Sequence, residues 1–597
     1  MNKLKWISFA LLCTATIIFV ACSSAPEKIR PTASTVTESP SVNKAYGAYL
    51  AGRVAHIRKD FDKASDYYIN SLSQDSDNKE LINNLYLLLV SQIRIDEAAI
   101  YAEKNILNGN KDNFSYTVIA TKHLHDKQYQ KSIAEISKFN NPAYSSFIGP
   151  LLNAWNYVGL NQPDKALKSL DILKKEAGFN GIYYFHTGLI NDYFNRTQEA
   201  QTAYEALINE EAVELSLRSL EVISNFYLRT AQPEKAQSIL SGISTEKNSS
   251  DILAELSSQI RSHASAPERI ISSPQEGAAE ALFSIAATFR YDDIIDIAHM
   301  FTALAIYQNP NYDLAKLLLA DILENRNMYN EANDVYDSIK ENSPAYYSAQ
   351  LKMAHNLIKQ QDYDRAEILL KSLALDYNKP QVYIDLGDVL RFKDDYKEAI
   401  KYYQTAINQN PDSENLWVLY YAMGISFEQN NNWQEAEKAL LKALELYPDH
   451  PLVLNYLGYT WLKQKQNINQ AFSMIINAYV QSPNNVNITD SLGWALYNLG
   501  YYGMAEKYLE KALQDAPANP VICDHLGDVY WFTGRRNEAR FKWQQALDLK
   551  DESGEINRKD IKNKLKNGIT AHPELNYDKD KITEQLKLIT QKITAKE

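Results

Sequence analysis

The chain carries a small residue at an almost constant spacing of about 34 residues along most of its length. The positions in this series are Ala64, Ala98, Ser132, Ala166, Ala200, Ala236, Ala298, Ala332, Ala366, Ala399, Ala436, Ala471, Ala505 and Ala539. Consecutive members keep nearly the same spacing, except for one much longer interval between Ala236 and Ala298. A unit this short cannot bury its own apolar face, so copies of it must stack on one another. The spacing therefore predicts a stack of repeated units rather than one compact core.

The stretch 491–547 shows the repeated unit most clearly. Gly493 and Gly527 are separated by one repeat length, as are Ala505 and Ala539, and Pro517 stands between the two copies. Small residues let two helices cross closely, and a proline ends a helix. A period of about 34 residues with paired helices is the signature of the tetratricopeptide repeat. We therefore predict an all-α, right-handed superhelical α-solenoid of about fourteen such repeats.

The long interval between Ala236 and Ala298 exceeds one repeat by most of a second repeat length, and it divides the predicted repeats into two arrays. We predict an N-terminal array of degenerate repeats at 45–245, a junction at 246–276 and a C-terminal array at 277–550. The sequence leaves open whether the junction is a hinge or a packed, irregular repeat. Residues 551–597 are expected to form an amphipathic capping helix over the end of the stack, followed by a tail that is either helical or solvated.

The first 21 residues fit the description of a bacterial lipoprotein signal peptide. A basic start precedes the apolar run 6–20, which is short for a transmembrane helix. The residues before Cys22 resemble a lipobox, so we expect cleavage before Cys22 and lipid modification of its side chain, with an uncleaved anchor as the alternative. Residues 22–44 are rich in Ser, Thr and Pro and predict a flexible tether. Among lipoproteins, Ser23 implies an outer-membrane location on the periplasmic side, and the inner membrane is the alternative.

Composition and motifs argue against catalysis and against nucleic-acid binding. The chain has 62 basic and 74 acidic side chains, a net charge of −12, and no dense basic stripe. None of the common phosphate-binding, zinc-protease or serine-hydrolase motifs occurs. His123 and His125 form a close pair, but residues two apart on a helix do not share a face, so we expect surface residues. Cys523 is interpreted as a small buried apolar residue. We predict no enzymatic activity, no cofactor and no metal site.

The first helix of each repeat is expected to line a concave groove. Counting the glycine of that helix as position eight, positions two, five, nine and twelve should face inward. The candidate binding residues at these positions are Asp388, Tyr421, Asn455, Tyr459, Asp490, Trp494, Tyr497, Asp524, Asp528 and Trp531. Aromatic side chains among carboxylates suit an extended peptide or a protein surface with basic and apolar groups. The alternative is that these residues cover the groove or contact the tail of the same chain.

Residues 277–550 resemble a family of bacterial tetratricopeptide lipoproteins. The segments that carry the resemblance are EALFSIA (280–286), LLLADILE (317–324), LGY (457–459), DSLGWALY (490–497), DHLGDVYW (524–531) and GRRNEARFKWQQAL (534–547). The family includes an outer-membrane lipoprotein that binds a periplasmic carboxyl-terminal processing protease and recruits its substrates, which are hydrolases of peptidoglycan cross-links. The resemblance implies a scaffold that brings a periplasmic protease and its substrates together. The alternative is an assembly factor for an outer-membrane complex such as a pilus, a secretin or a barrel.

Overall fold

The fold is that of a computed structural model, which describes residues 40–175, 178–210, 215–244, 251–262, 267–551, 554, 556–572 and 575–594. The predicted signal peptide, Cys22 and most of the tether lie outside the described residues, as does part of the junction at 246–276. Among the helices in the described ranges, none is both long enough and apolar enough to cross a membrane.

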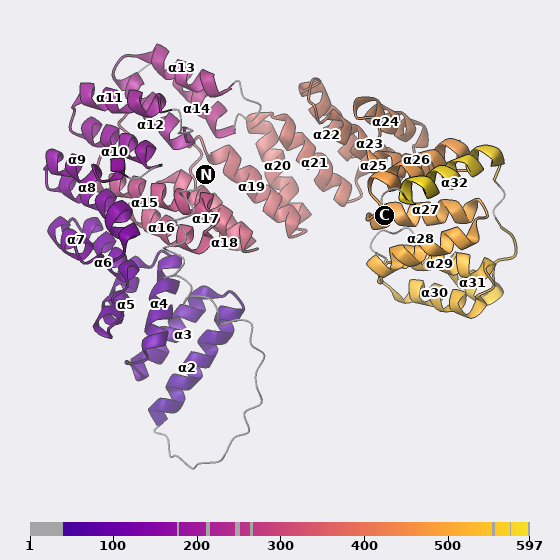
Figure 1. The fold of residues 1–597 in the computed structure, drawn as a ribbon, viewed down its shortest axis with the longest axis horizontal. Helices are drawn as coiled ribbons and strands as arrows, with labels where there is room; N and C mark the ends of the chain where they lie inside the picture. Colours follow the sequence, from indigo (N-terminus) through magenta and orange to yellow (C-terminus); the bar gives the residue numbers. More distant parts are fainter. Residues whose placement is uncertain are drawn as a thin grey trace. The chain divides into compact units, whose positions relative to one another are not determined.

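Fourteen pairs of helices follow one another in the described residues, which confirms the predicted all-α solenoid (Figure 1). The first six pairs are α2 (Pro40–Ile57) and α3 (Phe61–Gln74), α4 (Lys79–Ser91) and α5 (Ile95–Leu107), α6 (Asn113–His125) and α7 (Tyr129–Ile136), α8 (Gly149–Gly159) and α9 (Pro163–Leu170), α10 (Asn180–Tyr193) and α11 (Thr197–Ile208), and α12 (Leu217–Arg229) and α13 (Pro233–Ser244). After the single helix α14 (Asp251–Ser262) come α15 (Pro274–Tyr291) and α16 (Ile295–Gln308), α17 (Asp313–Asn325) and α18 (Tyr329–Asp337), and α19 (Tyr346–Lys359) and α20 (Tyr363–Tyr377).

The last five pairs are followed by two single helices. The pairs are α21 (Pro380–Phe392) and α22 (Tyr396–Gln409), α23 (Leu416–Gln429) and α24 (Trp433–Leu446), α25 (Pro451–Lys463) and α26 (Ile468–Gln481), α27 (Val486–Asn498) and α28 (Tyr502–Asp515), and α29 (Pro520–Phe532) and α30 (Arg536–Asp548). The single helices are α31 (Arg558–Asn567) and α32 (Lys579–Thr594). α31 lies within the segment that was predicted to form the capping helix. α32 shows that the tail is helical over Lys579–Thr594.

The turn inside each helix pair contains a residue in the left-handed backbone region. These residues are Lys59, Ile93, Lys127, Asn161, Asn195, Ala231, Asp293, Asn327, Gln361, Asp394, Asn431, Lys465, Gly500 and Gly534. Each lies five residues before the small residue of its repeat, or six in the case of Lys465. A left-handed residue ends a helix and redirects the chain, so that the next helix can pack back on the first. The spacing seen in the sequence is therefore the spacing of these turns.

The chain divides into two compact units, which are described separately. Unit 1 ends at Asp362 and unit 2 begins at Tyr363. The repeat spacing predicts an earlier division, at 246–276, whereas the structure groups α15–α19 with the N-terminal array. α14 packs on α13 and α19, and the Arg269 guanidinium donates to the Tyr193 carbonyl at 3.0 Å. The described part of the junction therefore packs within unit 1.

Helices α15 and α16 fill the concave side of the N-terminal array. α15 packs on α8 and α10, and α16 packs on α4 and α6, all of them first helices of their repeats. Figure 1 shows α15 and α16 inside the curve that α4 to α12 form. Most of the groove that such an array would offer to a partner is thus occupied by helices of the same chain.

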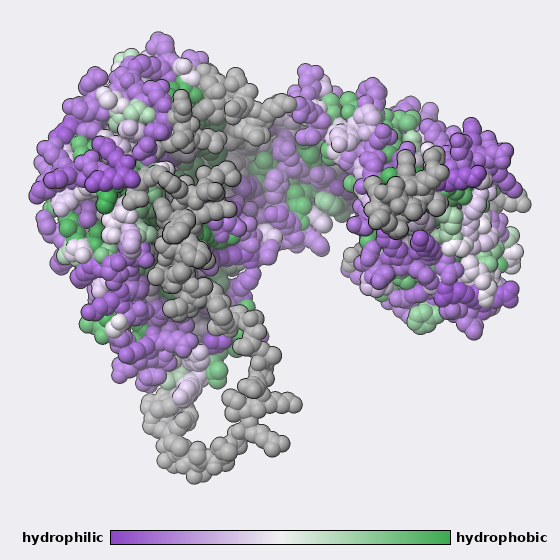
Figure 2. Space-filling model, in the orientation of Figure 1, coloured by the Kyte–Doolittle hydropathy of each residue, from purple (hydrophilic) through white to green (hydrophobic). Residues whose placement is uncertain are grey.

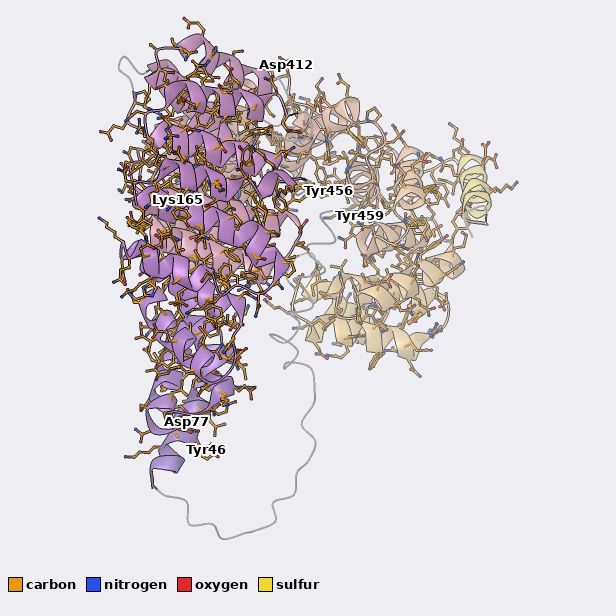
Figure 3. All side chains as sticks on the ribbon, turned by 60° about the vertical axis from the view of Figure 1, so that its left-hand side comes forward. Tyr46, Asp77, Lys165, Asp412, Tyr456 and Tyr459 are labelled. Atoms are coloured by element: carbon orange, nitrogen blue, oxygen red, sulfur yellow. The ribbon has the colours of Figure 1, made fainter. Side chains whose placement is uncertain are left out.

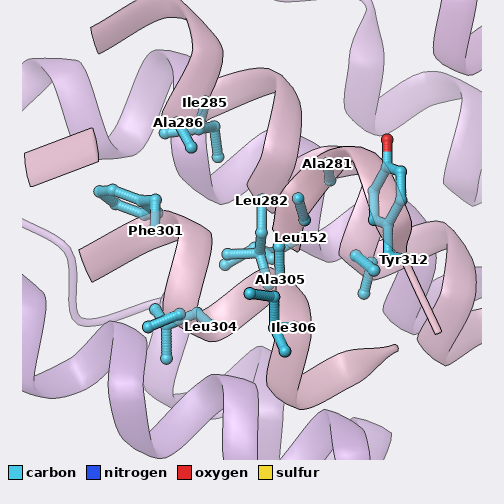
Figure 4. Packing of buried hydrophobic residues seen from close by; sticks show 14 of the residues in the cluster. Leu152, Ala281, Leu282, Ile285, Ala286, Phe301, Leu304, Ala305, Ile306 and Tyr312 are labelled. Atoms are coloured by element: carbon cyan, nitrogen blue, oxygen red, sulfur yellow. The ribbon is translucent and has the colours of Figure 1, made fainter. Parts of the chain in front are cut away.

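Helices α15 and α8 lie so close together that Gly277 of α15 has no room for a side chain. A Cβ atom on Gly277 would lie 2.1 Å from ring carbons of Trp155, whose indole is completely buried. Leu152 of α8 packs among Leu282 and Ile285 of α15 in the same core (Figure 4). One continuous apolar core runs from α2 to α19, so the filling helices are part of the unit's interior.

A buried group of charged side chains also joins the filling helices to the array. The Arg218 guanidinium on α12 donates through Nε to Glu280 Oε1 on α15 at 2.9 Å, and its Nη2 contacts the same oxygen. The Tyr312 hydroxyl, at the start of α17, donates to Glu280 Oε2 at 2.6 Å. Glu280 is only 1% exposed. A carboxylate this deeply buried is stable only with such partners.

Unit 2 keeps the simple order of a repeat stack over α21–α30, in which each pair packs on the next. α31 packs on α30 and α32 packs on α26. On the face shown in Figure 2, hydrophilic residues dominate each unit and hydrophobic residues form small separate groups. Val418 and Leu452, at inward positions of α23 and α25, are exposed apolar residues of unit 2.

Candidate protein-binding groove

The inward positions of unit 2 fall into two parts with different surroundings. We call the first part the open strip; it consists of Gln381, Ile384, Asp388, Arg391, Val418, Tyr421, Ile425, Glu428, Leu452, Asn455 and Tyr459, on α21, α23 and α25. We call the second part the closed end; it consists of Asp490, Trp494, Tyr497, Asp524, Asp528 and Trp531, on α27 and α29. Together they contain all ten candidate binding residues.

Polar side chains at the start of the open strip are held by one another. The Tyr403 hydroxyl of α22 donates to Asp388 Oδ1 at 2.7 Å. The Arg391 guanidinium contacts the same carboxylate oxygen at 3.3 Å and the Tyr403 hydroxyl at 3.3 Å. Asp388 and Arg391 are both half-buried, so part of each remains available to a partner.

The middle of the open strip combines exposed apolar groups with aromatic rings. Val418 is 40% exposed and Leu452 is 42% exposed. Tyr421 contacts Tyr456 edge to face, with ring centroids 5.9 Å apart. Tyr456 and Tyr459 both lie on α25 (Figure 3). The structure thus places Tyr421 and Tyr459 half-buried in one apolar and aromatic surface.

The side chain of Asn455 lies in the same surface with an unused acceptor. Its Oδ1 atom is buried and has no hydrogen-bond partner among the described residues. A buried carbonyl oxygen without a donor is unfavourable by about 1–3 kcal/mol. A ligand that offered an N–H group at this point would relieve that cost.

The closed end is a packed network rather than an open surface. The Asp490 carboxylate accepts from His525 Nδ1 at 2.9 Å, and both residues are buried. The Trp494 indole stacks on His525 with centroids 4.0 Å apart and on Tyr497 with centroids 4.8 Å apart. Burial acts to lower the pKa of His525, but the adjacent Asp490 carboxylate outweighs it, so the pKa is raised. A raised pKa favours the charged imidazolium beneath the indole.

A lysine of the capping helix α31 pairs with both acidic side chains of α29. Lys564 Nζ of α31 lies 3.0 Å from Asp524 Oδ1 and 2.8 Å from Asp528 Oδ2. Asp528 also accepts from Trp543 Nε1 at 2.8 Å. Burial acts to lower the pKa of Lys564, but the carboxylates of Asp528 and Asp524 raise it overall, so the lysine stays charged.

The segment after α31 covers the last aromatic residue of the closed end. Trp531 Nε1 donates to the Ile569 carbonyl at 2.9 Å. His572 Nε2 contacts the Tyr497 carbonyl at 2.7 Å, and the Tyr577 hydroxyl donates to the Leu499 carbonyl at 3.0 Å. The closed end therefore contacts the tail of the same chain, which is the alternative that the sequence left open. Whether its six residues also bind a partner stays a prediction.

Replacing Gly568 by alanine is expected to loosen the tail. Gly568 has φ +74°, and a Cβ there would lie 2.0 Å from the Trp531 ring. The left-handed backbone and the overpacking together should cost the docked tail at least about 2 kcal/mol. Hydrogen exchange of the amides in α31 and α32 measures this loss.

Gly534 provides the matched control for this substitution. It has φ +88°, but a Cβ there meets nothing within 4 Å. Gly534→Ala therefore introduces backbone strain of about 1 kcal/mol without overpacking, whereas Gly568, with ψ −172°, lies in a region open almost only to glycine. Equal protection of the tail amides in Gly568→Ala and in the unsubstituted chain would contradict the proposed contact.

The structure shows what surrounds His123, His125 and Cys523. His123 and His125 share no group of metal-ligating side chains, and no cluster of three such residues occurs in the described ranges. His125 is half-buried and stacks on Tyr307, with centroids 4.3 Å apart, so it is a packing residue rather than the expected surface residue. Cys523 is completely buried, and burial raises the pKa of its thiol to about 11. A thiol of that kind is a poor nucleophile.

Sequence reasoning missed two residues that organise the closed end. His525 directly follows the predicted Asp524, but nothing in its position indicated the pairing with Asp490, which is 35 residues away. Lys564 lay within the predicted amphipathic capping helix, and its placement on two carboxylates was not foreseen. The signal that could have found it is that the capping segment is rich in lysine and follows a repeat whose first helix carries two inward aspartates.

Comparison with known proteins identifies the repeat. Residues 378–457 and residues 490–519 match two family models that are both described as "Tetratricopeptide repeat". A tetratricopeptide-repeat-containing protein of Pseudomonas aeruginosa is 31% identical over 186 residues, which are 31% of this chain and 31% of the relative. A human protein O-mannosyl-transferase, TMTC1, is 25% identical over 226 residues, which are 35% of this chain and 25% of the relative. The match thus spans less than a third of either relative's own length.

Solved structures that resemble the chain have low overall similarity scores. The Cut9–Hcn1 hetero-tetramer of APC/C has a TM-score of 0.36 at 15% identity, covering 89% of this chain and 97% of that chain. Yeast Tom70 has a TM-score of 0.32 at 15% identity, covering 92% of this chain and 99% of that chain. The matched residues 378–457 and 490–519 coincide with helix pairs that carry the regular repeat spacing. The chain therefore folds as a solenoid of tetratricopeptide repeats.

Proposed function

We propose that this chain is a lipid-anchored scaffold of the bacterial cell envelope that binds a protein partner along the open strip. Tetratricopeptide repeats are protein-interaction scaffolds whose concave surfaces take peptides or protein faces. The repeats themselves hold no group of metal-ligating side chains in the described residues. In this proposal the chain recruits other proteins and performs no chemistry.

The observation that supports the open strip as the binding surface is its accessibility. Helices α15 and α16 fill the groove of unit 1 over most of its length, and α31 with the following segment covers the closed end of unit 2. The open strip keeps exposed apolar side chains at Val418 and Leu452, next to the half-buried charges of Asp388 and Glu428. An apolar centre with carboxylates beside it suits a partner with apolar and basic side chains.

The proposed partners are a periplasmic protease and the substrates that it cleaves. The resemblance of residues 277–550 to bacterial tetratricopeptide lipoproteins motivates this choice. An adaptor needs two surfaces that can be occupied at once, and a solenoid offers them by its length. Holding a protease and its substrate on one scaffold raises the effective concentration of one near the other.

Two aspartates in the open strip should weaken partner binding. Val418→Asp with Leu452→Asp places charge in the apolar centre of the strip, and we expect at least about tenfold weaker binding. The measurement is affinity capture from cells with the purified chain, identification of the captured protein, and titration of that protein against both forms. Captured proteins that belong to a secretin, pilus or barrel complex would favour the assembly-factor alternative instead.

The matched control for the open strip lies on a second helix, α24, outside the strip. Leu441 is 43% exposed and Leu446 is 41% exposed, both on the second helix α24. Leu441→Asp with Leu446→Asp should leave binding within about twofold, while both double variants keep their helical circular-dichroism signal. Equal loss of binding in both variants would remove the open strip as the binding surface.

Removal of the cysteine at position 22 tests the proposed anchor. Cys22→Ala should abolish the incorporation of labelled fatty acid into the chain, because the proposed acyl chains are attached at Cys22. Cys13→Ala, within the apolar run of the leader, is the control and should keep the label. A membrane-bound chain that carries no label even without a substitution would instead support an uncleaved anchor helix.

A further inference from the structure

Unit 1 contains a cavity of about 900 Å³ that the filling helices leave open. One wall consists of α2, α3 and α4, and the other of α16, α17 and α18. Tyr49, Arg53 and His56 of α2 line it at inward positions, as does Leu87 of α4. The cavity is therefore the N-terminal mouth of the same groove that α15 and α16 fill further along.

The floor of the cavity is apolar and comes from both walls. The apolar lining residues are Leu88 of α4, Met300 of α16, Leu319 and Leu323 of α17, and Met328. Leu88, Leu319, Leu323 and Met328 are buried, and Met300 is half-buried. Methionine side chains adapt to the shape of a partner, so such a floor suits an apolar protein segment.

A buried hydrogen-bond donor also lines the cavity. His299 of α16 is 3% exposed, and its Nδ1 accepts from the Arg326 guanidinium at 3.0 Å. Because an arginine can only donate, the proton of the neutral imidazole lies on Nε2. That Nε2 atom is buried and forms no hydrogen bond of normal geometry in the described part of the chain, although the imidazole interacts with the backbone of Ser91. A buried N–H without a well-placed acceptor is unfavourable, so a ligand carbonyl or carboxylate at this point would form a stabilising hydrogen bond.

Charges of both signs line the cavity, and the α2–α4 wall carries Asp60, Asp62 and Glu80 beside its basic side chains. Arg53 and Arg58 belong to the α2 side, and Glu331 and Asp334 belong to α18. All four are exposed, and none makes an ion pair or a side-chain hydrogen bond within the described residues. Elsewhere in unit 1, exposed charges commonly pair across neighbouring repeats, as Arg196 does with Asp164 at 3.0 Å. Unpaired charges of both signs beside an apolar floor suit an occupant with both signs of charge.

The size of the cavity agrees with the way in which the rest of the groove is filled. A helix with its side chains is about 11 Å wide and rises 5.4 Å per turn, so one turn occupies roughly 500 Å³. A volume of about 900 Å³ therefore holds nearly two turns. The neighbouring part of the same groove holds the helices α15 and α16.

We propose that this cavity, which we call the N-terminal cleft, binds an amphipathic helix of a second protein. The helix places its apolar face on Leu88, Met300 and Leu323, and a carbonyl or carboxylate near His299. Its acidic side chains face Arg53 and Arg58, and its basic side chains face Glu331 and Asp334. This site belongs to unit 1 and is independent of the open strip in unit 2.

Site-specific photocrosslinking in cells tests the occupant. The probe is p-benzoylphenylalanine at position 84, where exposed Asn84 lines the cavity, and at position 300 in a second variant. We expect one crosslinked protein from both positions, and the crosslinked peptide should have apolar residues at helical spacing with charges of both signs. Position 100, an exposed isoleucine of α5 that does not line the cavity, should give no such product.

Charge reversal decides whether the product comes from the N-terminal cleft. Arg53→Glu with Arg58→Glu should reduce the crosslink yield at position 84 at least about tenfold, because like charges then oppose the helix. Lys127→Glu with Lys131→Glu, on exposed residues that do not line the cavity, should leave the yield unchanged. Four outcomes would overturn the proposal: no adduct, adducts to residues 1–39 of this chain, adducts to a second copy, or a yield that the charge reversal does not change.

Discussion

Glu280→Gln is expected to destabilise unit 1 by about 3–5 kcal/mol, because it leaves the buried Arg218 guanidinium without its main counter-charge. Glu280 is 1% exposed, and its two oxygens accept from Arg218 and Tyr312. This single carboxylate joins α12, α15 and α17, so its loss should release the filling helices from the array. Hydrogen exchange of the α15 amides, followed as a function of urea, measures the effect in unit 1 alone.

A double substitution separates the buried charge from the packing. Arg218→Met with Glu280→Leu removes both charges and keeps apolar volume, and it should recover most of the lost stability. Glu331→Gln, at an exposed carboxylate that makes no ion pair in the described residues, should change stability by less than about 0.5 kcal/mol. A loss below about 1 kcal/mol in Glu280→Gln would show that water solvates Arg218 in the folded chain.

The second large effect is an acid sensitivity of unit 1 that comes from His186 and His299. Both side chains are buried, and burial lowers the pKa of each to about 3, with Arg326 adding to the effect at His299. In the unfolded chain a histidine has a pKa near 6.5. The folded state therefore binds fewer protons than the unfolded state between these values. Stability is complete above pH 6.5 and falls as the pH drops towards 3, by up to about 1.4 kcal/mol per pH unit for each histidine.

His186→Asn isolates one of the two contributions. His186 Nδ1 accepts from Trp155 Nε1 at 3.3 Å, and the asparagine carbonyl can take over that role without titrating. Between pH 6.5 and pH 4 the urea-unfolding free energy of unit 1 should fall by about 3 kcal/mol less in this variant than in the unsubstituted chain. His525 of unit 2 has a raised pKa, so its contribution has the opposite sign: it is present below pH 6.5 and is lost as the pH rises above its folded pKa. Identical pH dependence in His186→Asn would show that water reaches this imidazole.

The repeat architecture could be predicted from the sequence because each repeat is determined locally. The series from Ala64 to Ala539 marks close helix crossings, and the structure places a left-handed turn residue just before each of them. The packing of α15 and α16 in the groove depends on contacts between residues that are far apart in the sequence. The repeat spacing is a local pattern and does not predict such contacts. One signal was present: α16 reads IDIAHMFTALAIYQ and is apolar on nearly all sides, which indicates a helix buried all round.

The groove could be predicted in part. Counting positions from the glycine placed all ten candidate residues on the first helices of their repeats, at inward positions of α21 to α29. The counting did not reveal that Asp528 and Trp531 face α31 and the segment after it. Their partners Lys564 and Ile569 lie 36 and 38 residues further along the chain. Accessibility depends on what covers a surface, and the spacing within a repeat does not report that.

The filled groove gives unit 1 mechanical properties that a repeat stack ordinarily lacks. In an ordinary solenoid each repeat touches only its neighbours, so pulling on the ends unravels it one repeat at a time. In unit 1, Gln308 donates to the Thr121 carbonyl across 187 residues of sequence, and Lys59 donates to the Arg326 carbonyl across 267 residues. Contacts of such long range make folding slow and unfolding concerted. Under tension we therefore expect unit 1 to unfold in one cooperative step, and α21–α30 of unit 2 to unfold one repeat after another.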